Sequence, residues 1–445
     1  MTIDDAAKII EEKRIQLIFA QSVDLAGTTR AKLVPASHIR DLEGPDGGAF
    51  FAGFAAYGMG QAPHHPDLAA VPDWDTLTIL PWAPHVARFA CDVYLEGQPY
   101  QFCTRTILKR VLRQLATIGY QADVGLEPEF YLVRRTEQGL VPLDDADTLE
   151  RPCYDMRLLS RSLGFLQKLV ANMQQLGWDV LAVDHEDANG QFEVDFRFAD
   201  ALTTGDRYVF FRYMVSMMAH DLGGLACFMP KPWSDKTGNG AHFHLSLSDA
   251  RSQENLFRSS TDELGLSELA YNFIGGLLAH AKALAAITAP TVNSYKRLVA
   301  VAPTSGATWA PVAIVYGGNN RTQLLRVPGP GRVENRSIDS ACNPYLAAAA
   351  VFAAGLDGIQ RRLSPGRRND LNIYDLSQRQ LGELGIELMP SNLKEAVEQL
   401  AADAVLREAL GPEFVDYYVE LKTREWASYH NTVSQWEIDR YLNVY

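Results

Sequence analysis

The sequence predicts an α+β protein with a small N-terminal domain over residues 1–102 and a larger domain over residues 103–445. Its length of 445 residues exceeds what one domain usually holds. Hydrophobic residues make up 47% of the chain, which is enough for a large core. After residue 103, helical patterns alternate with strands that are apolar on one face and polar on the other. This pattern predicts a curved antiparallel sheet that is flanked by helices and has one polar face.

The N-terminal part has a mostly β pattern. A charged helix is expected over residues 3–14, and residues 44–65 lack periodicity, which indicates a long loop of the kind that is often functional. Strands are expected at residues 15–20, 32–35, 73–81 and 87–95. We place the domain boundary near Phe102.

The larger part opens with an amphipathic helix over residues 106–118, which Gly119 ends. Further helices are expected at residues 161–176, 208–222 and 345–356. The last of these contains the longest apolar run, which is too short to span a bilayer and therefore indicates a buried helix.

The strand pattern at residues 124–132 places two acids on one face. Glu127 and Glu129 alternate with Leu126, Pro128 and Phe130. Two like charges side by side repel, and a divalent cation would offset them because hard cations prefer carboxylate oxygen. For a single strand, a solvated face is the commoner explanation. The case for a metal depends on further strands with the same sidedness.

Three further stretches repeat this sidedness. Their polar faces carry Gln191, Glu193, Asp195 and Arg197; His242, His244 and Ser246; and Arg332, Glu334 and Arg336, with Glu186 nearby. Several acids with one histidine suit Mg²⁺ or Mn²⁺, whereas zinc would favour cysteine and more histidine. Arginines that suit phosphate and carboxylate accompany them: Arg297, Arg321, Arg326, Arg332 and Arg336. Acids can bind metal ions, metal ions can bind phosphate, and arginines can stabilise developing negative charge. Together these groups indicate phosphoryl transfer.

Composition and missing motifs exclude other classes. The net charge of −13 argues against a nucleic-acid or anionic-membrane partner. Neither a Walker lysine motif nor a Gly-x-Ser-x-Gly elbow is present, so a P-loop enzyme and a serine hydrolase are disfavoured. The five cysteines form no Cys-x-x-Cys pair, and the acidic N-terminus is no secretory signal, so a cytoplasmic location is expected. Any single acid could still be an ordinary surface residue, and a lone His242 an ordinary structural histidine.

Several motifs resemble those of the glutamine synthetase superfamily of ATP-dependent carboxylate–amine ligases, in the family's order and over nearly the whole chain. They are Glu-Pro-Glu-Phe at 127–130, Gly-Gln-Phe-Glu at 190–193, Gly-x-Gly-x-His-x-His at 238–244 and Asn-Ser-Tyr-Lys-Arg-Leu at 293–298. The resemblance implies an N-terminal β-grasp domain. It also implies active sites between the subunits of a hexameric ring, often doubled to a dodecamer.

The resemblance also implies roles for individual residues. Two or three Mg²⁺ or Mn²⁺ ions per site would be held by Glu127, Glu129, Glu186, Glu193, His242 and Glu334. The carboxylates of L-glutamate would be held by Gly238, Arg297 and Arg336. ATP would be bound by His244, Ser246, Arg326 and Arg332, with Phe198 near the adenine. Arg321 would stabilise the transferring phosphoryl group, and Arg297 and Glu334 would act beside it in catalysis.

Three departures from the family pattern are informative: two concern the amine and the third concerns a metal ligand. The family's ammonium-binding Asp loop corresponds to residues 53–58, which carry no acid, and its flap glutamate corresponds to Trp309. A tryptophan face suits an alkylammonium through cation–π contact and burial of a methyl group. The spacing of Glu186 to Glu193 is one residue short, which leaves Glu186, His185 and Asp187 as alternatives.

These features resemble the branch that ligates methylamine to glutamate. The alternatives are ligation of ammonia, ligation of another amine such as a polyamine or ethanolamine, and a non-catalytic member of the superfamily. The intact metal and arginine positions argue against the last of these.

Overall fold

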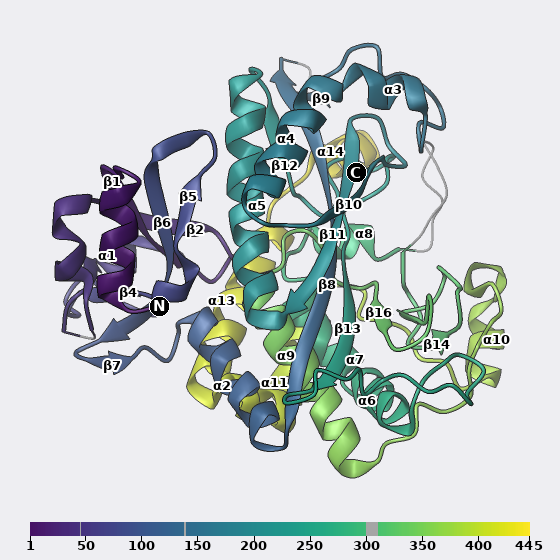
Figure 1. The fold of residues 1–445 in the computed structure, drawn as a ribbon. Coiled ribbons are helices and arrows are strands. Elements are labelled where there is room, and N and C mark those ends of the chain that lie inside the picture. The colour runs from purple at the N-terminus through teal and green to yellow at the C-terminus, as the bar shows by residue number, and fades with distance from the viewer. Residues whose placement is uncertain (45, 138, 300–309) are drawn as a thin grey trace.

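The computed structural model describes residues 1–44, 46–137, 139–299 and 310–445, which build two sheets covered by helices (Figure 1). The first sheet lies near the N-terminus and has the order β2-β1-β6-β4-β3, with β1 and β6 parallel. Its strands are β1 (Leu17–Val23), β2 (Thr29–Pro35), β3 (Ala49–Phe51), β4 (Leu68–Pro72), β5 (Thr78–Leu80), β6 (Ala83–Leu95) and β7 (Gln98–Pro99). Helix α1 (Ile3–Glu12) buries Ala6 and Ile10 in the small core of this sheet.

The second sheet carries the polar-faced strands in the order β10-β11-β8-β13-β16-β15-β14, with β9 and β12 also paired to β8. Its strands are β8 (Tyr120–Thr136), β9 (Gly139–Pro142), β10 (Val180–His185), β11 (Gln191–Asp200), β12 (Leu225–Cys227), β13 (Ala241–Asp249), β14 (Tyr316–Gly317), β15 (Leu325–Arg326) and β16 (Val333–Asn335). The pairs within it are antiparallel except β14 with β15. The predicted α+β class with an antiparallel catalytic sheet is therefore confirmed.

Helices cover the apolar face of the second sheet, and α5 also contacts β2 of the first (Figure 1). The helices after α1 are α2 (Thr104–Thr117), α3 (Met156–Arg161), α4 (Leu163–Gln175), α5 (Ala201–Asp221), α6 (Glu268–Ala279), α7 (Ala281–Thr288), α8 (Ser294–Arg297), α9 (Pro344–Arg361), α10 (Gln378–Glu383), α11 (Leu393–Ala402), α12 (Ala404–Leu410), α13 (Pro412–His430) and α14 (Gln435–Tyr441). The apolar run predicted as a buried helix lies within α9, whose alanines are almost all buried.

Three element predictions need correction. The helix expected at 161–176 is confirmed as α4, and the short α3, which meets it at Ser162, precedes it. The helix expected at 208–222 starts earlier, because the Asp200 side chain caps the first turn of α5. The strand expected at 73–81 is a 3₁₀ turn followed by the short β5, and the loop expected at 44–65 contains β3.

A buried ion cluster joins α2 to the N-terminal part and to α5. The Arg105 guanidinium is 2% exposed and donates to the carboxylates of Asp73, Asp92 and Asp206 at 2.9–3.0 Å. Lys109 Nζ adds bonds of 3.0 and 2.6 Å to Asp73 and Asp92. Asp73 and Asp92 belong to the N-terminal part, and Asp206 lies on α5, so the cluster fixes one part against the other. The boundary at residue 102 stays a prediction.

No helix in the described ranges is both long and apolar enough to cross a membrane. The cysteines, all at described positions, form no disulfide.

Candidate active site

Strand register places the predicted polar residues opposite one another. Glu127 on β8 pairs with His242 on β13, and His244 two residues on pairs with Glu334 on β16. On the other side of β8, Glu129 pairs with Glu193 of β11. Because side chains directly opposite on one face have Cβ atoms about 4.5–5.5 Å apart, these residues form one continuous polar surface.

This surface forms the floor of a cavity of about 400 Å³. The sidedness predicted for β8 is confirmed, because Leu126 and Phe130 on its other face are 1% and 0% exposed in the core. Predicted residues that line the cavity are Glu127, Glu129, Glu186, Glu193, Gly238, His242, His244, Arg297, Arg321, Arg326, Arg332 and Arg336. The roles assigned to them stay predictions.

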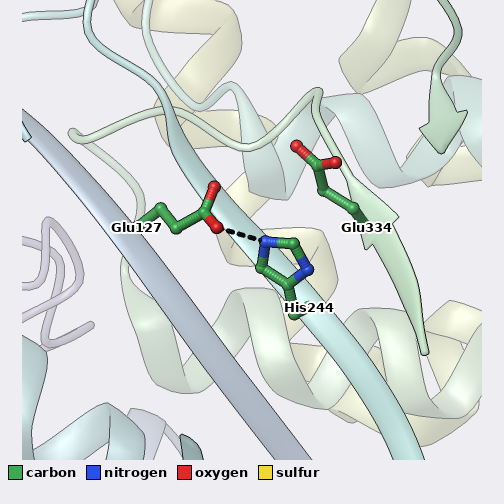
Figure 2. A group of neighbouring side chains, drawn as sticks. All are labelled: Glu127, His244 and Glu334. Carbon is green, nitrogen blue, oxygen red and sulfur yellow. Dashed lines mark hydrogen bonds and ion pairs between the residues drawn. The ribbon is translucent and has the colours of Figure 1, made fainter. Parts of the chain in front are cut away.

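The carboxylates of Glu127 and Glu334 are held by cationic or hydrogen-bonding partners. Figure 2 shows His244 between them, with its Nε2 2.6 Å from Glu127 Oε1. Arg336 and Arg326 donate to the two oxygens of Glu334 at 2.5 and 2.8 Å. Burial opposes ionisation, but Arg336 and the two histidines lower the pKa of Glu334 to about 2. Hydrogen bonds from His242 and His244 likewise outweigh burial and hold the pKa of Glu127 well below its usual range.

In a second group of acids the pKa values are raised rather than lowered. Burial and the charge of Glu129 raise the pKa of Glu186 to about 8. Burial together with Glu186 raises the pKa of Glu193 well above its usual range. For Asp195, burial and the charge of Glu127 raise the pKa to about 7. Carboxylates gathered without enough positive charge fit hard divalent cations, which would replace the protons.

Three groups of side chains in the described residues could each hold such an ion. Their candidate ligand atoms lie within 4.8 Å of one another. The groups are Glu127 with His244 and Glu334, Glu127 with Glu193 and His242, and Asp184 with Glu193 and Asp195. His244, which we expected at the nucleotide, therefore also lies among candidate metal ligands.

Two arginines and two glycines shape the wall expected to bind glutamate. Arg297 donates to the carbonyls of Ser337 and Arg336 at 3.2 and 3.0 Å, and these two hydrogen bonds fix the orientation of its guanidinium. A Cβ at Gly238 would lie 2.4 Å from Pro230 O, and one at Gly240 would lie 2.7 Å from His242 Nε2. Both positions require glycine because any side chain would displace the neighbouring backbone or ligand group.

A second cavity of about 620 Å³ adjoins the first, with Glu127, His244, Asp195 and Arg332 lining both. Ser246 and Phe198, both expected to contact ATP, line this second cavity, and the Phe198 side chain is 58% exposed. An exposed aromatic face that lines a cavity suits a stacked base. A nucleotide here would point its phosphates toward the shared acids and Arg332.

Of the three alternatives left open by the spacing, Glu186 is the one that lines the cavity. His185 is 1% exposed and bonds to Asp147, and Asp187 accepts a hydrogen bond from Thr237 at 2.6 Å. Trp309, predicted at the amine, lies outside the described residues.

The sequence analysis missed several residues of the site. Asp184 pairs with Glu193 across β10 and β11 and lines the first cavity. Cys153 and Tyr154 line it from the segment before α3, and Lys231 and Thr237 line it from the loop before β13. Asp184 carried a weak signal, because it lies two residues before Glu186, and Lys231 belongs to a Lys-Pro pair that resembles a family motif, whereas Cys153, Tyr154 and Thr237 carried none.

Comparison with known proteins shows the family of this chain. The sequence profile of the glutamine synthetase catalytic domain matches residues 101–441, and the chain therefore belongs to the glutamine synthetase family. Over the full length of both chains it is 47% identical to the glutamate–methylamine ligase of Methyloversatilis universalis. It is 43% identical, again over both full lengths, to a glutamine synthetase of Rhizobium leguminosarum. Among solved structures, GmaS in complex with ADP matches with a TM-score of 0.92 and 44% identity, covering 99% of each chain.

Proposed function

We propose that this protein is an ATP-dependent ligase that joins methylamine to the γ-carboxylate of L-glutamate. The products are γ-glutamylmethylamide, ADP and phosphate. The observation that carries the proposal is the pair of adjoining cavities, which share acids, a histidine and an arginine at their junction. One cavity suits a nucleotide and the other a dicarboxylate amino acid.

The chain's own residues bind and orient the substrates. Arg297 and Arg336, both fixed by further contacts, offer guanidinium groups to the carboxylates of glutamate. Arg321 lines the cavity as a donor for charge that develops on the phosphoryl group. Two or three Mg²⁺ or Mn²⁺ ions held by Glu127, Glu129, Glu186, Glu193, His242 and Glu334 would supply further positive charge to the phosphates. The γ-carboxylate attacks the terminal phosphoryl group and displaces ADP, and the neutral amine then displaces phosphate from γ-glutamyl phosphate.

The choice of methylamine rests on the sequence and on the relative that is 47% identical. Residues 53–58 contain no acid, and Trp309 stands where glutamine synthetases carry a glutamate. An alkylammonium has a pKa near that of lysine, about 10.4, so it must lose a proton before it attacks. An aromatic face attracts the cation and its methyl group together.

The active sites are proposed to lie between subunits of a hexameric or dodecameric ring, in the cytoplasm. Residues 53–58 do not line the first cavity in a single chain; residues 54–58 line a separate pocket with Tyr417. If this loop borders the amine site, it must come from a neighbouring copy. Phe54 and Tyr57 of the loop are 50% and 40% exposed, which suits such an interface.

An amine panel tests the proposal. With saturating glutamate, ATP and Mn²⁺, phosphate release is measured against methylamine, ammonia, ethylamine, ethanolamine and putrescine. The proposal expects the highest kcat/KM with methylamine. Equal or higher kcat/KM with ammonia would instead support a glutamine synthetase, the second candidate, which is favoured by the relative that is 43% identical.

A further inference from the structure

The acid at position 147 lies outside every motif that the sequence analysis singled out, yet it contacts the loop that carries Glu186. Asp147 is 5% exposed and lies in the segment between β9 and α3. Its Oδ2 is 2.8 Å from His185 Nε2 and accepts the Gly190 N–H at 2.5 Å. Its Oδ1 accepts from Asn189 Nδ2 at 2.9 Å. One carboxylate therefore bonds to both ends of the loop at residues 185–190.

The histidine transmits this contact to the ligand position. His185 Nδ1 lies 2.9 Å from the Glu186 carbonyl oxygen, while its Nε2 faces Asp147. Both ring nitrogens thus face oxygen acceptors, so the ring bridges the carboxylate to the backbone of Glu186. The Glu186 N–H in turn donates to Gln191 O at 2.9 Å, and Glu186 Oε2 accepts from Asp187 N at 2.8 Å.

The other end of the loop is constrained by close packing. Gly190 has φ +77°, and a Cβ there would lie 3.0 Å from Leu132 O and 3.1 Å from Pro142 Cβ. Its carbonyl accepts from Leu132 N on β8 at 2.8 Å. The Asp147 carboxylate therefore closes the loop against the strand that carries Glu127 and Glu129.

We propose that Asp147 is a positioning residue that fixes the 185–190 loop so that Glu186 is held ready to bind a divalent cation. The inference rests on the proposed function, because it takes Glu186 as a metal ligand. Partners that orient a ligand from behind typically change metal affinity 10- to 100-fold when they are removed. Asp147 acts through His185 and the loop backbone, and does not line the cavity itself.

Mn²⁺ binding to the purified full-length protein, measured by electron paramagnetic resonance without substrates, tests the role. Asp147→Asn keeps the shape but turns one acceptor oxygen into a donor, and it should weaken Mn²⁺ binding about 10- to 100-fold. Turnover at saturating Mn²⁺ should stay within about threefold of wild type, because the cavity residues are unchanged. The matched control is Asp145→Asn in the same segment, whose side chain is 74% exposed. It should bind Mn²⁺ as wild type does.

Mn²⁺ affinity of Asp147→Asn within twofold of the control would overturn the proposal. So would a loss of activity that saturating Mn²⁺ fails to restore, because that indicates a general structural role. Hydrogen exchange of the wild-type protein gives a test that needs no variant. The Gly190 amide should be strongly protected, and its exchange within seconds would overturn the proposed contact. Mn²⁺ binding and hydrogen exchange need no turnover, so failure of the amine panel would refute the methylamine assignment while the Mn²⁺ comparison still stands.

Discussion

Carboxylates lie close together in two clusters of this protein, and the clusters differ in whether neighbouring cations of the chain offset their mutual repulsion. At the junction of the N-terminal and catalytic parts, Asp73, Asp92 and Asp206 are satisfied by Arg105 and Lys109. In the candidate active site, Glu186 and Glu193 crowd together, and their pKa values are raised. The chain supplies its own cations where acids hold the fold, and leaves Glu186 and Glu193 without enough positive charge where metal ions are proposed to bind. Stability and function are therefore separated in space.

The largest expected effect is loss of the cation at the junction. Arg105→Ala leaves Asp73 and Asp92 with Lys109 and Asp206 with the Tyr345 hydroxyl, and breaking a buried ion network by removing one partner destabilises by about 3–5 kcal/mol. Thermal and urea unfolding measure this loss. Arg113→Ala, on an exposed face of the same helix, is the control and should leave stability nearly unchanged. A similar small effect for both variants would show that the junction ions contribute little.

Removal of an acid from the candidate active site should lower metal affinity and activity without lowering the stability of the metal-free protein. Glu193→Gln is expected to lower Mn²⁺ affinity and kcat/KM at least 10- to 100-fold, since it removes a proposed ligand. In EDTA, however, the melting temperature should stay equal or rise, because mutual repulsion is relieved. Calorimetry with EDTA and with Mn²⁺ separates the two effects. A lower melting temperature in EDTA would mean that Glu193 stabilises the fold, as the acids at the junction do.

The two clusters should respond to pH with opposite signs. The pKa of Glu186 is raised to about 8, so the folded protein retains a proton that the unfolded chain releases near pH 4.3. Without metal, this group's contribution to stability falls as pH rises from about 4.3 to 8. Burial would raise the pKa of Asp73, but Arg105 and Lys109 outweigh burial and lower it. The contribution of Asp73 to stability is therefore present above about pH 4 and is lost as pH falls further.

Metal-free unfolding from pH 4 to 9 checks these slopes, and Mn²⁺ titrations check the linked prediction. Mn²⁺ affinity should rise with pH up to about 8, because binding displaces protons from the site. Mn²⁺ affinity that does not change between pH 6 and 8.5 would show that these carboxylates are already ionised without metal.

The smallest expected effect concerns the amine. Trp309→Glu places an acid where the sequence has an aromatic ring, and it should shift the ratio of kcat/KM for methylamine over ammonia toward ammonia. A cation–π contact contributes about 0.5–2 kcal/mol, which corresponds to roughly a 2- to 30-fold shift. Trp309→Phe is the matched variant and should retain most of the preference. An unchanged ratio in Trp309→Glu would remove this residue from amine selection.

Much of the site could be predicted because its strands alternate. Glu127 and Glu129 on one face, with Leu126 and Phe130 on the other, already indicated a polar surface over an apolar core, and the structure confirms that sidedness. Helix ends were less predictable. Asp200 caps α5 eight residues before the predicted start, a local contact that the hydrophobic pattern does not report.

By itself the sequence determined which side chains share a face, because the two-residue period of a strand is a property of the backbone. It also determined which chemistry those faces offer, because carboxylate and guanidinium groups have fixed preferences for metals and phosphates. Only the tertiary structure decided that Glu129 lies opposite Glu193, that Asp184 joins them, and that Asp147 bonds to the loop of Glu186. Those neighbours are separated by up to 64 residues, and register across such distances follows from packing of the whole core.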